Sequence, residues 1–190
     1  YTTSKIEAPE DLFALRTFGF RGEALAAIAA VSRMKIVSRR DGQAAGVEVR
    51  VEGGVLKHSG ETGCPSGTSV EVKELFFNVP ARLKFLKSPG TELGHIGDIL
   101  AKTALANPQA RFQLLHEGKL LAAYPLREDP SSRLVEALGN DVQGKMFPFQ
   151  YRQGELKISG FAGEPGLTRS NSRGIYLFVN RRPVRDRLLT

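Results

Sequence analysis

Two short segments of the sequence combine residue types that can bind phosphate groups. In one, Gly19 and Gly22 flank Arg21 immediately before an alanine-rich stretch. Glycines let backbone N–H groups approach an anion closely, and a helix starting at Gly22 would direct unpaired N–H groups at it. In the other, the run Thr2-Thr3-Ser4-Lys5 offers hydroxyls and an ammonium group. Taken alone, the first pattern is also common in proteins that bind nothing, and the second is more typical of a turn.

A third candidate is a basic segment between residues 169 and 187, where six arginines accompany a single acid, Asp186. The arginines are Arg169, Arg173, Arg181, Arg182, Arg185 and Arg187. Together with a net charge of +7, this segment indicates an anionic partner such as nucleic acid. A solvated basic face is the alternative, both here and for Arg82, Lys84 and Lys87, and charge alone does not decide between them.

Length and composition exclude several classes of protein. The 190 residues suffice for one large domain or two small ones. No apolar run approaches the ~20 residues that a membrane span requires. Cys64 is the only cysteine, which excludes an internal disulfide and a cysteine-rich metal site and favours a reducing, cytoplasmic setting. The first ten residues lack the layout of a secretory signal, so the sequence is expected to begin inside a longer protein.

Hydrophobic periodicity in the first half predicts a helix followed by antiparallel strands. Apolar residues at helical spacing predict a helix over residues 22–31. Val47, Val49 and Val51 alternate with charged residues, which predicts a strand that turns at Gly53-Gly54 into a hairpin. Val70 and Val72 predict a further strand, and Pro80 can open a short helix through Leu86. The run Ser88-Pro89-Gly90-Thr91 then breaks the pattern and predicts a domain boundary.

The second half mixes helices and strands. Apolar positions from Leu93 to Ala104 predict a helix that stops at Asn107-Pro108. Residues 112–116 and 119–124 are expected to form a hairpin about Glu117-Gly118. Ser131 and Ser132 are suitable N-caps for a helix through Leu138, which Gly139 would terminate. The wholly apolar run 175–179 predicts a strand that is covered on both faces.

These motifs also occur in a recognisable order. Thr3-Ser4-Lys5-Ile6 precedes Gly19-Phe20-Arg21-Gly22-Glu23-Ala24-Leu25, and Gly67-Thr68, Leu75-Phe76-Phe77-Asn78-Val79-Pro80-Ala81-Arg82 and Val179-Asn180 follow. In order and spacing they resemble the MutL family of DNA mismatch repair proteins over almost the whole chain. The motif from Gly19 to Leu25 is the most specific of them, because the related gyrase B and Hsp90 families use different lid sequences.

The resemblance implies an α/β (α+β) fold. Residues 1–88 would be the C-terminal part of an ATPase sandwich of the gyrase, Hsp90, histidine kinase and MutL type, including its ATP lid. Residues 89–190 would be an incomplete transducer domain similar to domain 2 of ribosomal protein S5. The implied cofactors are ATP and Mg²⁺. Thr68 is expected near adenine, and the residues expected to close over the triphosphate are Thr3, Ser4, Lys5, Phe20, Arg21, Gly22, Glu23, Ala24 and Leu25.

Several functional residues of the family have no counterpart here. The family's glutamate general base, its Mg²⁺-binding asparagine and its adenine motif precede the lid, and a lysine that contacts the γ-phosphate follows the position of Thr190. Glu23 is not that base. No catalytic or metal-binding residue is therefore assigned, and residues 1–190 alone are expected to be inactive. Arg181 also stands where many members have glycine, which makes this edge more basic.

The implied function is that of an ATP-dependent matchmaker in mismatch repair. The intact protein is expected to dimerise with a second copy when ATP binds, to contact DNA regardless of sequence, and to relay signals from a MutS-type mismatch sensor to a downstream endonuclease or helicase. The expected DNA contacts are Arg182, which matches a family arginine near the DNA groove, and Arg181, Arg185, Arg169 and Arg173. The alternative is a DNA-binding module with no nucleotide role, in which the glycine motifs are only turns.

Overall fold

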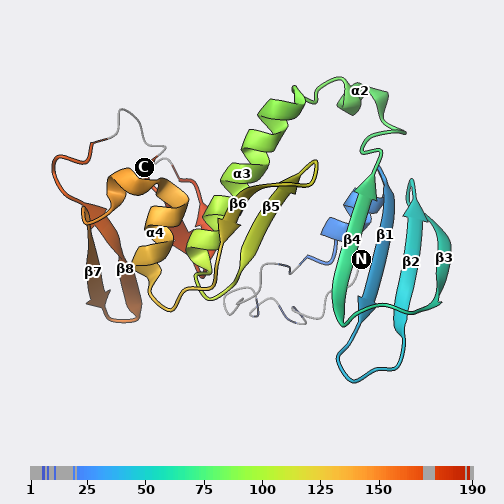
Figure 1. The fold of residues 1–190 in the computed structure, drawn as a ribbon, viewed down its shortest axis with the longest axis horizontal. Coiled ribbons are helices and arrows are strands. Elements are labelled where there is room, and N and C mark those ends of the chain that lie inside the picture. Colours follow the sequence, from blue (N-terminus) through green and yellow to red (C-terminus); the bar gives the residue numbers. More distant parts are fainter. Residues whose placement is uncertain are drawn as a thin grey trace. The chain divides into compact units, whose positions relative to one another are not determined.

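The structure, a computed structural model, describes residues 6, 8, 11, 19, 21–168, 174–186 and 188. Two compact units make up the chain, Tyr1–Lys87 and Ser88–Thr190. Both units combine helices with antiparallel strands (Figure 1). In the described part of the chain, no helix is both long and apolar enough to cross a membrane.

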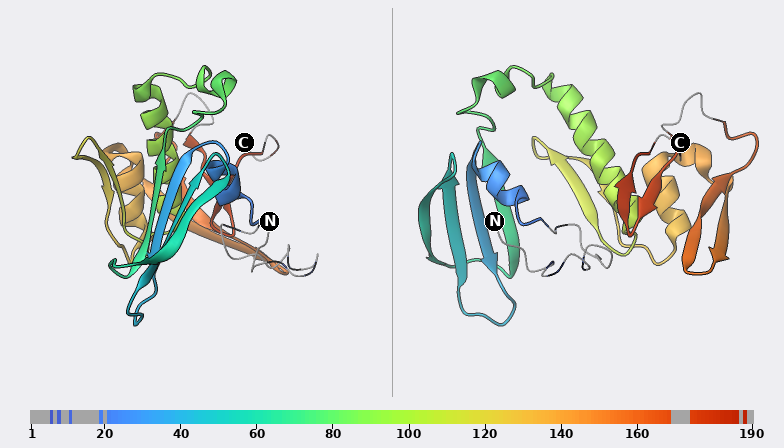
Figure 2. Two further views of the ribbon diagram at one scale, coloured as in Figure 1. Left: turned by 90° about the vertical axis from the view of Figure 1, so that its right-hand side faces the viewer. Right: turned by 180° about the vertical axis from the view of Figure 1, so that it is seen from behind.

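The first unit is built on a four-stranded antiparallel sheet with the strand order β3-β2-β1-β4. Its strands are β1 (Arg33–Arg39), β2 (Gly46–Glu52), β3 (Val55–Thr62) and β4 (Gly67–Lys73). Strand β1 is central because it pairs with β2 on one side and with β4 on the other. Helix α1 (Ala24–Ala29) lies against β1 (Figure 2). The alternating valines thus predict β2 and β4 correctly, whereas β1 alternates over only its first residues and was not predicted.

The glycine turn between β2 and β3 confirms the predicted hairpin. Gly53 and Gly54 have φ values of 54° and 85°. Positive φ at both central residues defines the turn whose twist matches that of two antiparallel strands. The turn places Glu52 opposite Val55, so the hairpin begins directly at the glycine pair.

Within the described residues of the first unit, both α-helices are shorter than predicted. Helix α1 begins at Ala24, because Gly22 has a φ of 69° that lies outside the helical region. Leu25 and Ile28 are 51% and 37% exposed, and Ala29 is the buried residue of this helix. Helix α2 (Pro80–Leu83) also ends early. Beyond it, the N–H groups of residues 85 and 86 bond carbonyls three residues back, so the backbone continues in tight turns.

In its described residues, the second unit contains two longer helices and three two-stranded antiparallel sheets. Its helices are α3 (Pro89–Ala106), α4 (Pro130–Leu138) and the 3₁₀ turn η2 (Asn140–Val142). Its strand pairs are β5 (Phe112–His116) with β6 (Lys119–Tyr124), β7 (Met146–Gln153) with β8 (Leu156–Gly163), and β9 (Leu177–Val179) with β10 (Arg182–Val184). Helix α3 contacts α4, β5 and β10. The predicted hairpin at Glu117-Gly118 is confirmed, whereas the β7–β8 pair was not predicted.

Residues 88–91 form the start of a helix, although their composition is typical of a loop. Ser88 is the N-cap of α3, and its hydroxyl lies 2.9 Å from the Thr91 hydroxyl. Pro89 occupies the first turn, where its missing N–H costs no hydrogen bond. Proline and glycine are therefore compatible with this helix start, and α3 begins four residues before Leu93. It ends at Ala106, as the sequence predicts.

The cap of α4 also differs from the prediction. Asp129, rather than Ser131 or Ser132, is the N-cap, and its carboxylate accepts hydrogen bonds from the N–H groups of both serines at 3.0 and 3.2 Å. The Ser131 hydroxyl donates to the same carboxylate. This side-chain bond, followed by the backbone bonds, lowers the pKa of Asp129. Gly139, with a φ of 101°, ends the helix as predicted.

The apolar run at residues 175–179 forms a shorter and more exposed strand than predicted. Only Leu177–Val179 is a strand, and Ile175 and Val179 are 47% and 57% exposed. The expectation that both faces of this strand are covered is therefore wrong. Strand β9 pairs only with β10, so it belongs to a two-stranded ribbon and not to the interior of a larger sheet.

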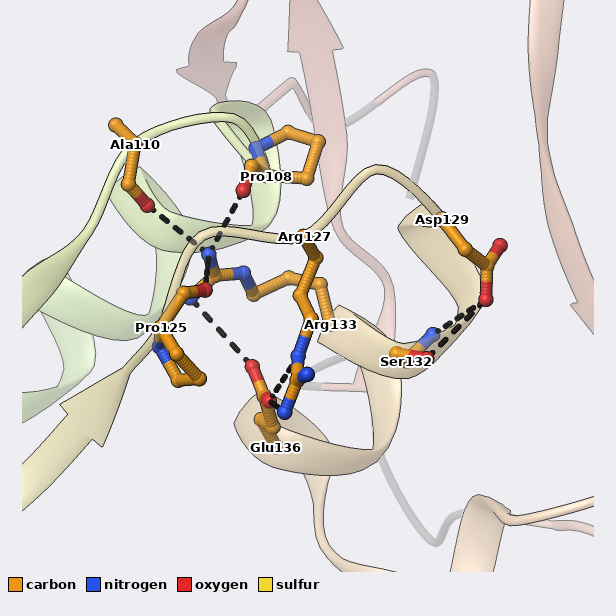
Figure 3. Close-up of polar contacts among 8 residues, drawn as sticks. All are labelled: Pro108, Ala110, Pro125, Arg127, Asp129, Ser132, Arg133 and Glu136. Atoms are coloured by element: carbon orange, nitrogen blue, oxygen red, sulfur yellow. Dashed lines mark hydrogen bonds and ion pairs between the residues drawn. The ribbon is translucent and has the colours of Figure 1, made fainter.

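A charged residue, Arg133 on α4, is almost fully buried in the second unit, with 1% of its surface exposed. Its Nη2 lies 3.0 Å from the carbonyl oxygens of both Pro108 and Ala110 and 2.6 Å from that of Pro125 (Figure 3). An NH₂ group has two hydrogens, so at least one of them is shared between acceptors. Arg133 thereby joins α4 to the α3–β5 and β6–α4 connections.

An acidic neighbour compensates the buried charge of Arg133. Glu136 Oε2 lies 3.6 Å from Arg133 Nη1, and Glu136 Oε1 accepts a 2.7 Å bond from Arg127 Nε (Figure 3). The guanidinium of Arg133 also lies 5.5 Å from the centre of the Tyr124 ring. Burial lowers the pKa of Arg133, and the Glu136 carboxylate opposes this shift. The Glu136 carboxylate and the Tyr124 ring therefore both stabilise the positive charge of Arg133.

Candidate functional site

The predicted lid is described only in part. Thr3, Ser4, Lys5 and Phe20 lie outside the described residues. Arg21, Gly22 and Glu23 are exposed and lead into α1, which contains Ala24 and Leu25. Glu23 is the N-cap of α1, but its side chain makes no capping bond. Gly22 has a left-handed φ of 69°, a conformation that glycine adopts readily, and it lies outside the helix that was expected to start there.

Thr68, the residue expected near adenine, lies at the start of β4. It is exposed and stands opposite Ser38 of β1 in the sheet register. The two hydroxyl oxygens are 2.8 Å apart. Thr68 therefore belongs to the same sheet against which α1 packs, although its role at adenine stays a prediction.

The basic segment is built on the β9–β10 hairpin. Asn180 and Arg181 form its two-residue turn, with φ values of 49° and 66°. Arg181 and Arg185 are exposed, whereas Arg182 is half-buried at the start of β10. Arg169, Arg173 and Arg187 lie outside the described residues. The structure therefore places three of the arginines in or directly after this hairpin, and Arg182 is the half-buried one among them.

Replacing Arg181 by glycine is expected to stabilise the second unit by about 0.5–1 kcal/mol. A left-handed conformation costs a non-glycine residue roughly 1–2 kcal/mol, which the larger conformational entropy of an unfolded glycine partly offsets. Thermal unfolding followed by circular dichroism measures the change. Arg185→Gly is the matched control, because Arg185 is exposed and its φ is not positive. Equal destabilisation by both substitutions would contradict the strain argument.

The loop after β4 contains contacts that the sequence did not predict. Arg33 Nε donates to Glu74 Oε2 at 2.9 Å, and the Arg33 guanidinium lies 5.3 Å from the centre of the Phe77 ring. The amide of Asn78 donates to the Ala30 carbonyl at 2.9 Å. The only sequence signal was the polar Asn78 directly after two phenylalanines. These contacts join the loop to both α1 and β1.

The described residues contain no group of three or more His, Cys, Asp or Glu side chains arranged to hold a metal ion. Cys64 is half-buried and forms no disulfide.

Comparison with known proteins relates this fold to one family. A family model described as "DNA mismatch repair protein, C-terminal domain" matches residues 134–190. The DNA mismatch repair protein MutL of Symbiobacterium thermophilum is 45% identical over 185 residues, which are 97% of this chain and 29% of that protein. MutL of Syntrophus aciditrophicus is 42% identical over 189 residues, with 100% and 31% covered. The chain thus spans less than a third of the length of these relatives.

A solved structure, the Aquifex aeolicus MutL ATPase domain complexed with ADP, matches with a TM-score of 0.73 and 32% identity. The match covers 96% of this chain and 68% of that one. The fold is therefore that of a partial ATPase sandwich of the gyrase, Hsp90, histidine kinase and MutL type, followed by a ribosomal protein S5-like domain. The chain belongs to the MutL family of DNA mismatch repair proteins. The resemblance drawn from its motifs is confirmed.

Proposed function

We propose that this chain supplies the ATP lid and the DNA-contacting domain of an ATP-dependent mismatch repair protein. The observation that carries the proposal is the left-handed Gly22 beside the exposed Arg21, within a chain whose fold matches a MutL ATPase domain complexed with ADP. Residues 1–88 would form part of the nucleotide-binding domain and residues 89–190 part of the transducer domain. ATP binding would act as a switch.

In this proposal the lid residues act by enclosing the triphosphate. Arg21 supplies a charge, and the turn at Gly22 lets backbone N–H groups approach phosphate oxygens. Thr3, Ser4, Lys5 and Phe20 would complete the lid, and Thr68 would lie near adenine. Closure excludes water and positions the reacting groups. Mg²⁺ would neutralise charge on the phosphates, although the described residues contain no group of three or more His, Cys, Asp or Glu side chains that could hold it.

A nucleotide titration on the longer protein tests this function against its rival. Binding of ATP, with a response of the lid, is expected if the proposal holds. A flat titration, together with retained DNA binding, would instead favour a DNA-binding module in which the glycine motifs are only turns. Both outcomes can be measured on one preparation by fluorescence anisotropy of labelled nucleotide and labelled DNA.

Residues 1–190 alone are expected to show no ATP turnover above background. The family's glutamate base and Mg²⁺-binding asparagine match no position of this chain, and Glu23 is not in a comparable place. A coupled phosphate-release assay on purified residues 1–190 measures this. Turnover that persists after further purification would show that a general base lies within the chain.

For the second unit, we propose that the β9–β10 hairpin contacts DNA phosphates. Arg181 at the tip and Arg185 after β10 are exposed, and Arg182 lies between them. Arg169 and Arg173 would add to the same surface. Phosphate contacts carry no base information, and each neutralised phosphate releases counterions. Binding should therefore be insensitive to sequence and should weaken steeply with salt.

Replacing Arg182 by Glu is expected to weaken binding to every duplex alike and to lower the salt slope by roughly one unit or slightly more. Anisotropy titrations at several salt concentrations measure both effects. Because Arg182 is half-buried, a thermal melt must first show that the variant folds. Arg152→Glu, an exposed arginine on β7, is the control. If the folded Arg182 variant keeps the parent's affinity and slope, the DNA surface lies elsewhere, with Arg82, Lys84 and Lys87 next to be tested.

We also propose partners for the intact protein. The intact protein would form a homodimer when ATP binds, receive the signal of a MutS-type mismatch sensor, and pass it to a downstream endonuclease or helicase. A cytoplasmic location would follow from this role. Size-exclusion chromatography of the longer protein with and without an ATP analogue tests the dimer, because a mass that does not change on addition of the analogue would contradict it.

A further inference from the structure

Every carbonyl from Ala29, the last residue of α1, to Ser32, the residue before β1, accepts a hydrogen bond from another segment of the first unit. A helix leaves its last carbonyls without partners within the helix. Here two donors come from the β2–β3 turn: Gly54 N bonds Ala29 O at 2.9 Å, and Gly53 N bonds Ser32 O at 3.0 Å. Two further donors come from residues 74–78, which we name the anchor loop. The end of α1 is therefore held by two separate segments.

The anchor loop contributes one side-chain bond and one backbone bond. Asn78 Nδ2 donates to Ala30 O at 2.9 Å, and Phe76 N donates to Val31 O at 2.7 Å. Glu74 and Phe76 have φ values of 50° and 67°, which non-glycine residues rarely adopt. Such backbone persists only where surrounding contacts determine it, and the bonds to α1 are among those contacts.

The packing around the anchor loop is also close. A Cβ atom at Gly53 would come within 3.3 Å of Asn78 Nδ2 and 3.4 Å of the Phe77 ring. Arg33 binds Glu74 and stacks on Phe77, as described above. The anchor loop is thus enclosed by β1, the β2–β3 turn and the end of α1, so a shift of α1 changes the position of Asn78 or breaks its bond.

The anchor loop continues without interruption into residues 79–87, which we name the connector. Val79 N bonds Phe76 O at 3.0 Å, and Arg82 N bonds Val79 O at 2.9 Å. Phe85 N then bonds Arg82 O at 3.0 Å. The connector ends where the second unit begins at Ser88. A series of short-range hydrogen bonds therefore runs from the anchor loop to Leu86, two residues before the second unit begins.

We propose that Asn78 is a positioning residue that couples the ATP lid to the connector through the end of α1. This inference rests on the proposed nucleotide function. Arg21 and Gly22 lie just before the N-cap of α1, so a nucleotide bound at these two residues displaces or fixes a helix that is only six residues long. The Asn78 bond transmits that change to the connector, and hence to the start of the second unit.

The test uses the full-length protein and trypsin, because Arg82 and Lys84 of the connector are exposed cleavage sites. Cleavage at these two sites is followed with and without a non-hydrolysable ATP analogue. In the parent, the analogue is expected to slow cleavage. Asn78→Asp keeps the size of the side chain but replaces the amide donor by an acceptor. The variant should bind the analogue with nearly the parent's affinity. Its protection, the ratio of the cleavage rates without and with the analogue, should be about threefold to tenfold smaller than the parent's, the range expected for one hydrogen bond.

Asn107→Asp is the matched control. Asn107 Nδ2 donates to the carbonyl of Thr103 at 2.9 Å, the same kind of bond at the end of another helix, α3. This variant loses an equivalent bond without touching the anchor loop, so it should keep the protection by nucleotide. A merely structural role for Asn78 would raise cleavage equally with and without the analogue and would leave the ratio unchanged.

Three results would overturn the inference while leaving nucleotide binding intact. These are full protection in Asn78→Asp, equal loss of protection in Asn107→Asp, and a parent that binds the analogue without any change at Arg82 or Lys84. A parent that gives a flat titration with the analogue would overturn the proposed function, and this inference with it. The binding titration therefore separates the two failures.

Discussion

Replacing Arg133 by Met is expected to lower the free energy of unfolding of the second unit by about 3–5 kcal/mol, the usual cost of removing one partner from a buried ion pair. The loss of the guanidinium removes the side-chain donor of the Ala110 and Pro125 carbonyls, whereas the Pro108 carbonyl keeps its bond from Arg127 N at 2.9 Å. It also leaves Glu136, whose side chain is 18% exposed, with Arg127 as its remaining partner. The methionine side chain has a similar length, so the loss in free energy of unfolding measures mainly the lost polar contacts and less the lost side-chain volume.

Urea unfolding followed by tyrosine fluorescence measures this change. The chain has no tryptophan, and Tyr124, Tyr151 and Tyr176 all lie in the second unit, so the signal reports mainly on that unit. Arg152→Met is the control, because Arg152 is exposed and such surface substitutions usually cost within about 0.5 kcal/mol. A loss below about 1 kcal/mol for Arg133→Met, less than a single unsatisfied buried group costs, would contradict the role assigned to Arg133.

Replacing Arg21 by Ala in the longer protein is expected to weaken nucleotide binding by about 1.5–3 kcal/mol, or roughly tenfold to 150-fold in the dissociation constant. The reason is the loss of a charge-assisted contact with a phosphate oxygen. Arg21 is exposed and precedes the left-handed Gly22, where the backbone turns into α1. Isothermal titration with an ATP analogue measures the dissociation constant.

Arg40→Ala is the matched control for this measurement. Arg40 is an exposed arginine of the same unit, located between β1 and β2 and outside the predicted lid. It should bind nucleotide like the parent. If Arg21→Ala changes neither the affinity nor the rate of ATP turnover, the lid assignment of this segment is wrong, whatever the fold shows.

The family and the broad fold were predictable because their signals are local. The motif from Gly19 to Leu25 is contiguous, and the alternating valines of β2 lie within seven residues. The glycine pair at positions 53 and 54 specifies its own turn, since positive φ at two successive residues favours glycine. Such features need no knowledge of distant neighbours.

Element boundaries were less predictable because caps and turns compete for the same residues. Ser88 to Thr91 has the composition of a loop, yet Ser88 caps a helix that accepts Pro89 in its first turn. Likewise, Asp129 competes with Ser131 and Ser132 for the cap of α4, and its carboxylate binds both serine N–H groups. The strand at residues 177–179 is short because β10 alone pairs with it, which depends on the rest of the chain.

By itself, the sequence determined the family, the α+β class, the hairpin turns at Gly53-Gly54 and Glu117-Gly118 and the placement of basic charge, since each depends on residues close together along the chain. Only the tertiary structure decided that Arg133 is buried against three carbonyls and that Asn78 bonds the end of α1. Asn78 lies 48 residues from Ala30, and Pro108 lies 25 residues from Arg133. A polar side chain has the same local sequence signal whether it faces water or a distant carbonyl, and only folding brings the two partners within hydrogen-bond distance.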